Sequence, residues 1–248
     1  MKLSVIIPAH NEGDCIAGTV RELHRVLSAE NIPHEILVVN DNSCDHTQSI
    51  LEELKNEIGP LRILFNPPPN GFGLAVRKGL EAVNGDAVAL MMADGSDSPQ
   101  DLVRFYRTIQ EGYDCVFGSR FISGSKVTGY PPLKRVLNRI FNTSIRVLFG
   151  LKYNDVTNAF KMYRADVLQG LRPFLSHHFN LTVELPLKAI VRGYSYTILP
   201  NSWKSRSSGK SNLKIKEMGS KYLFIVIYCF IEKWLCSQDY SKKKAGAH

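Results

Sequence analysis

ALMMADGSDSP, residues 89–99, joins an apolar run of strand length to a polar segment that holds two aspartates, Asp94 and Asp97. A buried strand that ends in carboxylates places oxygen ligands at the edge of a sheet, and Mg²⁺ and Mn²⁺ prefer such ligands. The same residue types also form ordinary turns, and Asp97 could cap a helix that begins near Pro99. The segment alone therefore leaves two interpretations open, a metal site and a plain turn.

Strands and helices alternate on both sides of this segment. Short runs rich in Val, Ile and Leu predict strands, and longer runs with apolar residues at helical spacing predict helices. We expect strands at residues 2–10, 34–43, 61–65, 86–94, 113–119 and 194–200. We expect helices near residues 16–27, 50–58, 73–83, 99–112, 134–150, 180–193 (interrupted or bent at Pro186) and 215–237. This alternation is typical of an α/β protein with a mostly parallel sheet that helices cover on both faces.

Polar clusters follow four of the expected strands. They are residues 8–12, 40–43, 94–97 and 118–120. The carboxyl ends of parallel strands meet at one edge of the sheet, and ligands of such proteins bind there. The sequence therefore predicts a single binding site to which all four clusters contribute.

Composition limits the function classes. The 248 residues carry 31 Lys and Arg against 23 Asp and Glu, a net charge of +8, which favours an anionic partner such as a nucleotide, a phosphorylated substrate, nucleic acid or an acidic membrane. The five cysteines are dispersed and form no Cys-x-x-Cys pair, so neither disulfides nor a zinc cluster is expected. A reducing, cytosolic setting fits this pattern best. The N-terminal apolar run lacks the length and cleavage site of a signal peptide, so secretion is not expected.

Several common catalytic motifs are missing from the sequence. It holds no Gly-x-x-x-x-Gly-Lys-Ser/Thr, and the segment GFGLAV, residues 71–76, lacks the third glycine of a dinucleotide-binding fingerprint. Neither His-Glu-x-x-His nor Gly-x-Ser-x-Gly occurs. ATPase, dehydrogenase, zinc-protease and α/β-hydrolase chemistry therefore have no support.

Six segments in fixed order resemble family 2 glycosyltransferases of the GT-A fold, and within them the polyprenyl-phosphate sugar synthases of the dolichol-phosphate mannose synthase group. The segments are SVIIPAHNE (4–12), ILVVNDNSCDHT (36–47), NGFGLAVRKGLEAVNGD (70–86), MMADGSDSP (91–99), VFGSRF (116–121) and NDVTNAFKMYR (154–164). The resemblance covers roughly residues 2–213. It implies a catalytic domain at 1–213. The apolar and lysine-rich residues that follow predict an amphipathic, membrane-interfacial helix with a basic tail at 214–248.

The resemblance also implies donor-binding residues. The segment that lines the nucleotide base maps to Pro8, Ala9, His10, Asn11 and Glu12, with His10 in place of the usual tyrosine. The residue expected to contact base and ribose is Asp41, and the glycine segment near the donor holds Gly71 and Gly73.

The metal-binding Asp-x-Asp of the family aligns with Met92, Ala93 and Asp94, so a methionine replaces the first aspartate. The resemblance implies that Asp94 keeps the Mg²⁺ or Mn²⁺ that binds the donor diphosphate, with Asp97 adding negative charge. Mg²⁺ usually keeps several waters, so one carboxylate with phosphate oxygens is a reasonable site. A weakened or lost metal site is the alternative.

Cationic side chains are expected beside the leaving group and beside the acceptor phosphate. The resemblance places Arg206 and Lys210, from the basic segment 204–214, near the donor, although that segment could equally be a solvated linker. It places the acceptor phosphate on Arg120, Lys134 and Arg135; a salt bridge is the alternative role for Arg120. It also puts Asp155 near donor or metal and Glu184 on a helix facing the site, with a buried structural carboxylate as the alternative for Glu184.

The apolar segment at residues 222–231 is only half the roughly 20 residues that a membrane-spanning helix needs. Its flanking lysines predict a helix that lies in the membrane interface, and a core or dimer helix is the alternative. The leading expectation is an inverting transferase that moves a hexose, mannose from GDP-mannose foremost, to a polyprenyl phosphate on the cytosolic membrane face. Left open are a UDP-sugar donor, a hydroxyl acceptor, a nucleotide-sugar-binding protein without turnover, and a homo-oligomer or membrane-protein partner; no nucleic-acid partner is expected.

Overall fold

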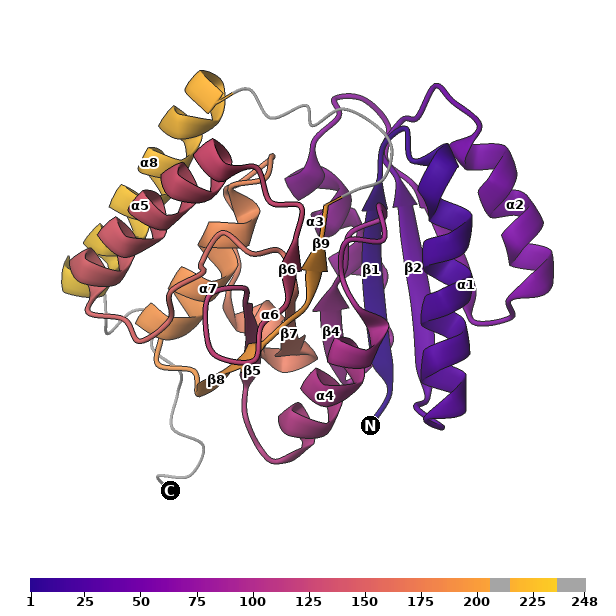
Figure 1. Ribbon diagram of the computed structural model, residues 1–248, viewed down its shortest axis with the longest axis horizontal. Helices are drawn as coiled ribbons and strands as arrows, with labels where there is room; N and C mark the ends of the chain where they lie inside the picture. Colours follow the sequence, from indigo (N-terminus) through magenta and orange to yellow (C-terminus); the bar gives the residue numbers. More distant parts are fainter. Residues whose placement is uncertain (206–214, 236–248) are drawn as a thin grey trace.

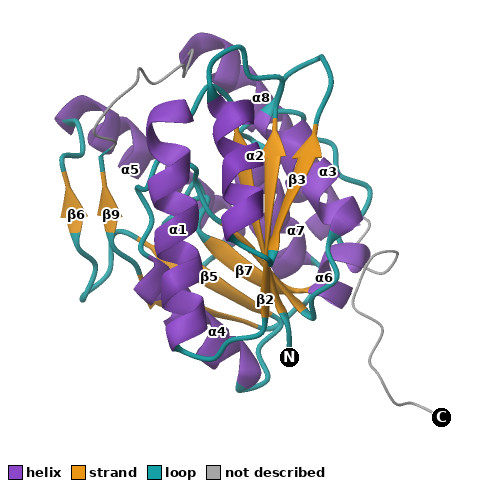
Figure 2. Ribbon diagram, turned by 90° about the vertical axis from the view of Figure 1, so that its right-hand side faces the viewer, coloured by secondary structure: helices purple, strands orange, loops and turns teal. Residues whose placement is uncertain are grey.

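The computed structural model describes residues 1–205 and 215–235, which form three layers with a sheet between two sets of helices (Figures 1 and 2). The seven-stranded sheet has the order β3-β2-β1-β4-β7-β5-β8. Its strands are β1 (Leu3–Ala9), β2 (His34–Asn40), β3 (Leu61–Phe65), β4 (Ala87–Leu90), β5 (Cys115–Ser119), β7 (Lys161–Arg164) and β8 (Tyr196–Pro200). A separate pair joins β6 (Val127–Thr128) to β9 (Trp203–Lys204).

All sheet strands run parallel except β7, which pairs antiparallel with β4 and with β5. The prediction of a mostly parallel, helix-covered sheet is confirmed. Strand β7 was not among the predicted strands. The predicted strand 86–94 is shorter than expected, since β4 ends at Leu90 and the chain then turns through the two aspartates.

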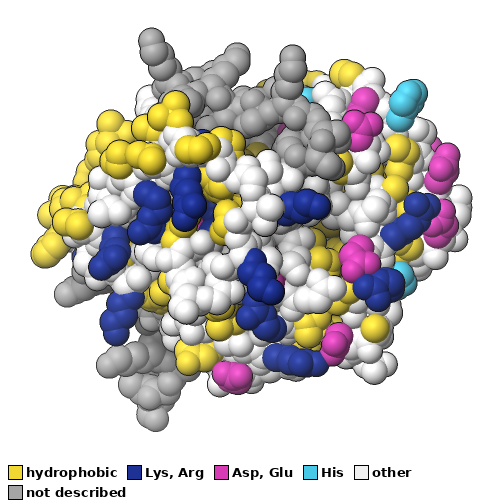
Figure 3. All heavy atoms as spheres, in the orientation of Figure 1, with side chains coloured by type: hydrophobic (Ala, Val, Ile, Leu, Met, Phe, Trp, Pro, Cys, Tyr) yellow, Lys and Arg dark blue, Asp and Glu magenta, His cyan; other side chains and the backbone are white. Residues whose placement is uncertain are grey.

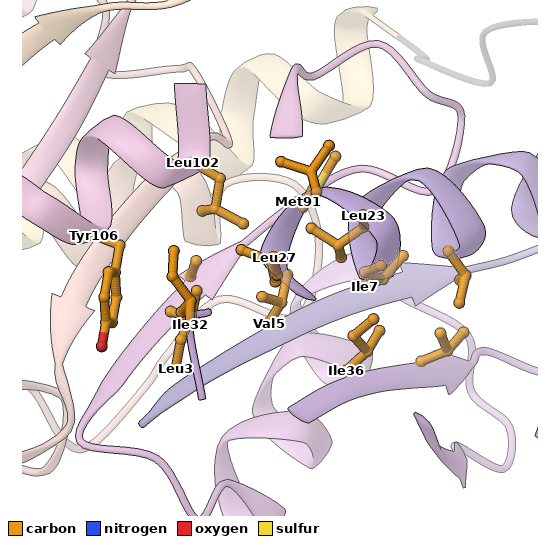
Figure 4. Close-up of a cluster of buried hydrophobic side chains, with 14 of the residues drawn as sticks. Leu3, Val5, Ile7, Leu23, Leu27, Ile32, Ile36, Met91, Leu102 and Tyr106 are labelled. Atoms are coloured by element: carbon orange, nitrogen blue, oxygen red, sulfur yellow. The ribbon is translucent and has the colours of Figure 1, made fainter. Parts of the chain in front are cut away.

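One face of the sheet is covered by α1 (Gly13–Ala29), α2 (Thr47–Glu57) and α4 (Pro99–Gln110). Alternate residues of β1, Leu3, Val5 and Ile7, point into this layer because side chains of a strand alternate between the two faces (Figure 4). They pack against Leu23 and Leu27 of α1. Burial of these apolar side chains holds β1 at the centre of the sheet.

The opposite face carries the remaining helices. They are α3 (Phe72–Ala82), α5 (Pro132–Phe149), α6 (Ala165–Gly170), α7 (Leu181–Val191) and α8 (Ile215–Leu235). Ile6 of β1 points into this second core, which also contains Val76 of α3, Leu185 of α7 and Ile225 of α8. The two cores lie on either side of one sheet, so the strand ends are fixed from both faces.

Helix α7 runs through Pro186. A proline inside a helix has no N–H for the carbonyl four residues earlier, which here belongs to Thr182. The buried ammonium of Lys161, at the start of β7, donates to that carbonyl at 3.1 Å. The missing helical hydrogen bond is therefore replaced by a side chain from the sheet.

Helix α8 packs against α7 through a buried ion pair. Nε and Nη2 of Arg192 donate to the two carboxylate oxygens of Glu232 at 2.6 and 3.0 Å, and both side chains are at most 3% exposed. Ile225 and Cys229 of α8 are fully buried beside this pair. No helix within the described ranges is both long enough and apolar enough to cross a membrane.

Substituting Glu232 by leucine should destabilise the fold strongly. The change leaves Arg192 buried without its carboxylate, and losing one partner of a buried pair costs about 3–5 kcal/mol. Urea unfolding followed by circular dichroism would measure the loss. Glu57→Ala, which removes an exposed pair with Arg21, is the control and should leave the midpoint nearly unchanged. Equal midpoints for the two variants would contradict the role of the buried pair.

Candidate active site

The predicted convergence of polar clusters is found at the carboxyl edge of the sheet, where β1, β2, β4 and β5 end. Asp41, directly after β2, is 4% exposed. Its Oδ2 accepts the N–H of Gly71 at 2.9 Å, and its Oδ1 accepts Asn66 Nδ2 at 2.6 Å. This carboxylate thus ties the end of β2 to the glycine segment that opens α3.

His10 lies beside Asp41, after the buried strand end formed by Pro8 and Ala9. Its Nδ1 lies 2.7 Å from the carbonyl oxygen of Asp41. A carbonyl only accepts, so in that contact Nδ1 carries the proton and Nε2, 3.3 Å from Asn11 Nδ2, is the acceptor. These two contacts hold the imidazole in one orientation at this edge of the sheet. Nearby, the backbone N–H of Glu12 donates to Thr47 Oγ1 at 2.9 Å.

Gly71 and Gly73 are required by a close approach of backbone. A Cβ on Gly71 would lie 2.3 Å from the carbonyl oxygen of His177, and one on Gly73 would lie 2.5 Å from that of Ser176. Real Cβ atoms do not approach backbone so closely, so only glycine fits at either position. The segment 174–178, to which the sequence assigned no part in the site, thereby lies next to Asp41.

Glu184 fixes that same segment. Its carboxylate is fully buried and accepts the N–H groups of Leu175 and Ser176 at 2.8 and 2.7 Å. It also pairs with Lys188 one turn later on α7, at 2.6 Å. These contacts match the structural alternative for Glu184, a buried carboxylate that shapes the edge from behind.

The two aspartates of the opening segment lie in different environments. Asp94 is half-buried, and its Oδ1 accepts the N–H of Ser96 at 3.1 Å, while the carbonyl of Ala93 accepts Thr19 Oγ1 at 2.8 Å. Asp97 is 5% exposed, and its Oδ2 accepts the N–H of Met92 at 3.0 Å. Asp94 thus lies at the surface of the site, and Asp97 lies beneath it.

Burial raises the pKa of Asp97 to about 7; the hydrogen bond from Met92 opposes the rise and the charge of Asp94 adds to it. The ligands that Asp94 and Asp97 could offer a metal ion are carboxylate oxygens, which suit a hard cation such as Mg²⁺ or Mn²⁺. Over residues 1–205 and 215–235, no three His, Cys, Asp or Glu side chains gather as a metal cluster. A cation bound at Asp94 would therefore complete its coordination with ligand oxygens and water.

Arg120 and Asp155 form a buried ion pair at the end of β5. Asp155 accepts the backbone N–H of Arg120 at 2.9 Å and its Nε and Nη2 at 2.8 Å each. Burial lowers the pKa of the Arg120 guanidinium, but the charge of Asp155 more than reverses this and raises it above its ordinary value. The guanidinium lies over the rings of Phe121 and Tyr130, 5.5 Å from each centroid.

Beside this pair lies a cavity of about 500 Å³, which we call the arginine pocket. Of the predicted acceptor residues, Arg120 and Arg135 line it, whereas Lys134 is exposed on α5 and is not in the lining. Arg139 also lines it and lies 4.7 Å from the Phe121 centroid. Sequence reasoning missed Arg139, although it follows Arg135 by one helical turn and so shares its face. The predicted Arg206 and Lys210 lie outside the described residues.

Strand β9 connects the aspartate segment to the arginine pocket. On one side, Lys204 N–H donates to the carbonyl of Ser96 at 3.0 Å, and the backbones of Trp203 and Asp97 pair in an isolated antiparallel β-bridge. On the other side, Trp203 N–H donates to the carbonyl of Lys126 at 2.8 Å, and its ring lies 5.0 Å from that of Tyr130. The carboxylate and cationic halves of the site therefore form one structure.

The mostly parallel sheet, with a carboxylate segment and a cationic pocket at its carboxyl edge, has the GT-A fold. The family model for glycosyl transferase family 2 matches residues 4–172, more than half of the sequence, and the chain belongs to that family.

Two curated relatives are similar over most of the chain. Polyprenol monophosphomannose synthase of Mycolicibacterium smegmatis is 30% identical over 215 residues, which cover 84% of this chain and 80% of the relative. Dolichol-phosphate mannosyltransferase of Pyrococcus furiosus is 28% identical over 223 residues, 87% of this chain and 60% of the relative. The chain thus spans somewhat less than two thirds of the second protein's length.

Solved structures with the same fold include glucosyl-3-phosphoglycerate synthase of Mycobacterium tuberculosis. A complex with Mn²⁺, uridine-diphosphate and glucosyl-3-phosphoglycerate matches with a TM-score of 0.67 at 17% identity, over 94% of this chain and 79% of that chain. A complex of the same enzyme with Mg²⁺ and uridine-diphosphate gives 0.66 at 17% identity, with the same coverage. At this identity the likeness establishes the fold.

Asp97→Asn should change how stability depends on pH. The raised pKa means that between about pH 4 and pH 7 the folded protein keeps a proton that the unfolded chain loses, so wild-type stability falls as pH rises through this range. Asparagine does not titrate, so the variant should gain up to about 4 kcal/mol relative to wild type between pH 4 and pH 8. Urea midpoints at both pH values measure the difference.

Asp45→Asn provides a control of opposite sign. Burial raises the pKa of Asp45, but hydrogen bonds from Thr47 and Gly13 outweigh it and lower the pKa overall. Asp45 therefore stabilises wild type above its unfolded pKa and loses that contribution as pH falls. The same pH slope for wild type and Asp97→Asn would contradict a buried, proton-holding Asp97.

Proposed function

We propose that the chain transfers a hexose from a nucleotide-diphosphate sugar to a polyprenyl phosphate with inversion, mannose from GDP-mannose being the favoured donor and a UDP-sugar the second. One observation carries the proposal: β9 joins the carboxylate segment to the arginine pocket at one edge of the sheet. The names of the two curated relatives support the sugar and the lipid phosphate.

The donor would bind at the ends of β1 and β2. Asp41 and the backbone of Gly71 are hydrogen-bonded to each other and would present one wall to base and ribose, with His10 as the other wall. An imidazole whose Nε2 accepts from Asn11 therefore stands where the tyrosine expected from the family pattern would place a phenol. Pro8, Ala9 and Glu12 belong to this wall as the continuation of β1.

Asp94 would hold Mg²⁺ or Mn²⁺ together with the donor diphosphate. Asp97 beneath it would hold the backbone at Met92 and, in its deprotonated form, would add negative charge. A bound divalent cation would neutralise charge that develops on the departing nucleoside diphosphate. Ala93 keeps this segment in place through its hydrogen bond with Thr19. We propose that Arg206 and Lys210 also help to neutralise the charge on the departing nucleoside diphosphate.

The acceptor phosphate would bind in the arginine pocket. A phosphate monoester has its second pKa near ~6, so it is mainly a dianion at neutral pH and is a competent nucleophile without a general base. Because Asp155 already balances Arg120, the charge that meets this dianion would come mainly from Arg135 and Arg139. Lys134 is then a neighbouring cation. We place the enzyme peripherally on the cytosolic membrane face, where such an acceptor presents its phosphate.

Met92 favours a second candidate, a nucleotide-sugar-binding protein without turnover, because it removes one carboxylate from the metal segment. Incubation with radiolabelled GDP-mannose or UDP-glucose and a polyprenyl phosphate, followed by extraction, separates the candidates. Label in the organic phase that is lost on adding EDTA supports the proposal. Label only in an aqueous product would indicate a hydroxyl acceptor, and donor binding without any product would indicate the non-catalytic protein.

Asp94→Asn should reduce transfer by about two orders of magnitude or more, because it removes the charge that would hold the cation on the leaving group. The initial rate of label transfer at saturating Mn²⁺ measures the effect, and circular dichroism checks the fold. Asp166→Asn is a matched control, since this carboxylate is 76% exposed and follows β7, which runs antiparallel to β4 and so ends at the opposite edge of the sheet. Wild-type turnover in the Asp94 variant would reject the donor site.

Arg135→Ala should raise the KM for a short, water-soluble polyprenyl phosphate about tenfold or more, with kcat changed little. A hydrogen bond to a charged group contributes about 1.5–3 kcal/mol, and each 1.4 kcal/mol is a factor of ten. Arg146→Ala is the control, because it removes an exposed cation of the same helix outside the pocket. An unchanged KM in the Arg135 variant would remove this residue from the acceptor site.

A further inference from the structure

Helix α5 has an apolar face that nothing in the described protein covers. Its inner face packs into the second core through Asn142, Ile145 and Phe149. Its outer face bears six large apolar side chains that are 44–76% exposed and recur at helical spacing: Leu133, Val136, Leu137, Ile140, Val147 and Leu148.

Helix α8 has the same division. Ile225, Val226 and Cys229 face the core. The outer face bears six large apolar side chains that are 47–78% exposed: Leu223, Phe224, Ile227, Ile231, Trp234 and Leu235. Of all large apolar side chains exposed in the described ranges, only Met1 and Phe65 lie elsewhere than on α5 or α8.

The two outer faces form one surface, which we call the α5–α8 face. The helices lie side by side, with the rings of Phe141 and Tyr222 5.3 Å apart and those of Phe149 and Phe230 5.9 Å apart. Lys233 Nζ of α8 also donates to the carbonyl of Phe149 at 2.8 Å. In Figure 3 apolar side chains gather on the side of the molecule where these helices lie. A contiguous exposed patch of this kind marks an interaction site.

Charge selects the partner of this face. Helix α5 contains four cations, Lys134, Arg135, Arg139 and Arg146, and no acidic residue. A second copy of the chain would bring like charge against like in a symmetric contact, which is unfavourable. Anionic lipid headgroups instead complement apolar side chains flanked by Lys and Arg, and an aromatic residue such as Trp234 suits the boundary between headgroups and acyl chains.

We propose that the α5–α8 face docks on an anionic lipid bilayer, with both helices lying in the plane of the interface. The inference deepens the proposed function and rests on it for the role of the arginine pocket. Arg135 and Arg139 line that pocket from the same helix whose outer face enters the membrane. Docking therefore sets the pocket at headgroup depth, where a phosphate attached to a membrane lipid would be found.

Vesicle co-sedimentation tests the docking surface. Wild type should bind vesicles of phosphatidylcholine mixed with phosphatidylglycerol, and bind vesicles of phosphatidylcholine alone at least about tenfold less, because each basic residue near an anionic surface adds to the attraction. Charges placed on the outer face should lower binding to the anionic vesicles at least about tenfold. The face variants are Ile140→Glu with Val147→Glu on α5, and Ile227→Glu with Ile231→Glu on α8. The control is Phe65→Glu, an exposed apolar residue of β3.

Circular dichroism checks that each variant is folded, and each is also assayed for transfer to a short, water-soluble polyprenyl phosphate. Wild-type binding by the face variants, or equal binding of wild type to neutral vesicles, would overturn the inference. So would light scattering that finds a dimer dispersed by the face substitutions while vesicles are not bound. If no protein transfers sugar but vesicle binding follows the expected order, the proposed function fails and the docking surface stands.

Discussion

The buried ion pair between Arg120 and Asp155 is the contact around which the candidate site is organised. Taking both charges out of water is costly, and the cost is offset only because three hydrogen bonds join the two residues. The pair fixes the end of β5 to the loop before β7 and holds the guanidinium against Phe121 and Tyr130. With Arg120 balanced, the net positive charge of the pocket comes from α5. The helix that would bind the acceptor phosphate is thus one of the two that form the α5–α8 face.

Most of the fold could be predicted because local pattern and tertiary position agree. Strands β1 and β2 are continuous runs of β-branched and apolar residues, and their helices have regular apolar faces. Strand β7 could not be found in this way. It has four residues, Lys161–Arg164, with a cation at each end, and only its pairing between β4 and β5 makes it a strand. The buried Lys161 looks like a surface residue in sequence because its three carbonyl partners are assembled by the fold.

The site divides in the same way. Asp41 and Arg120 follow strands directly and Asp94 lies in the turn after β4, so the sequence brings them to one edge. The 174–178 segment reaches that edge because two glycines far away in the chain leave room for its backbone, a relation with no local signal. Asp155 was predicted near donor or metal, and the structure shows it as the buried partner of Arg120. Whether a carboxylate coordinates an ion or anchors a neighbouring cation depends on the partners that tertiary structure supplies.

Pro186 and Lys161 have a consequence for how the chain tolerates change. The lysine ammonium occupies the place of the amide hydrogen that proline lacks, so the two positions are interdependent although they belong to different layers. Removing the ammonium alone would leave that carbonyl unsatisfied, whereas an amide restored at 186 would satisfy it again. Replacing Lys161 should therefore cost less in a chain that has an amide at 186 than in one that keeps the proline.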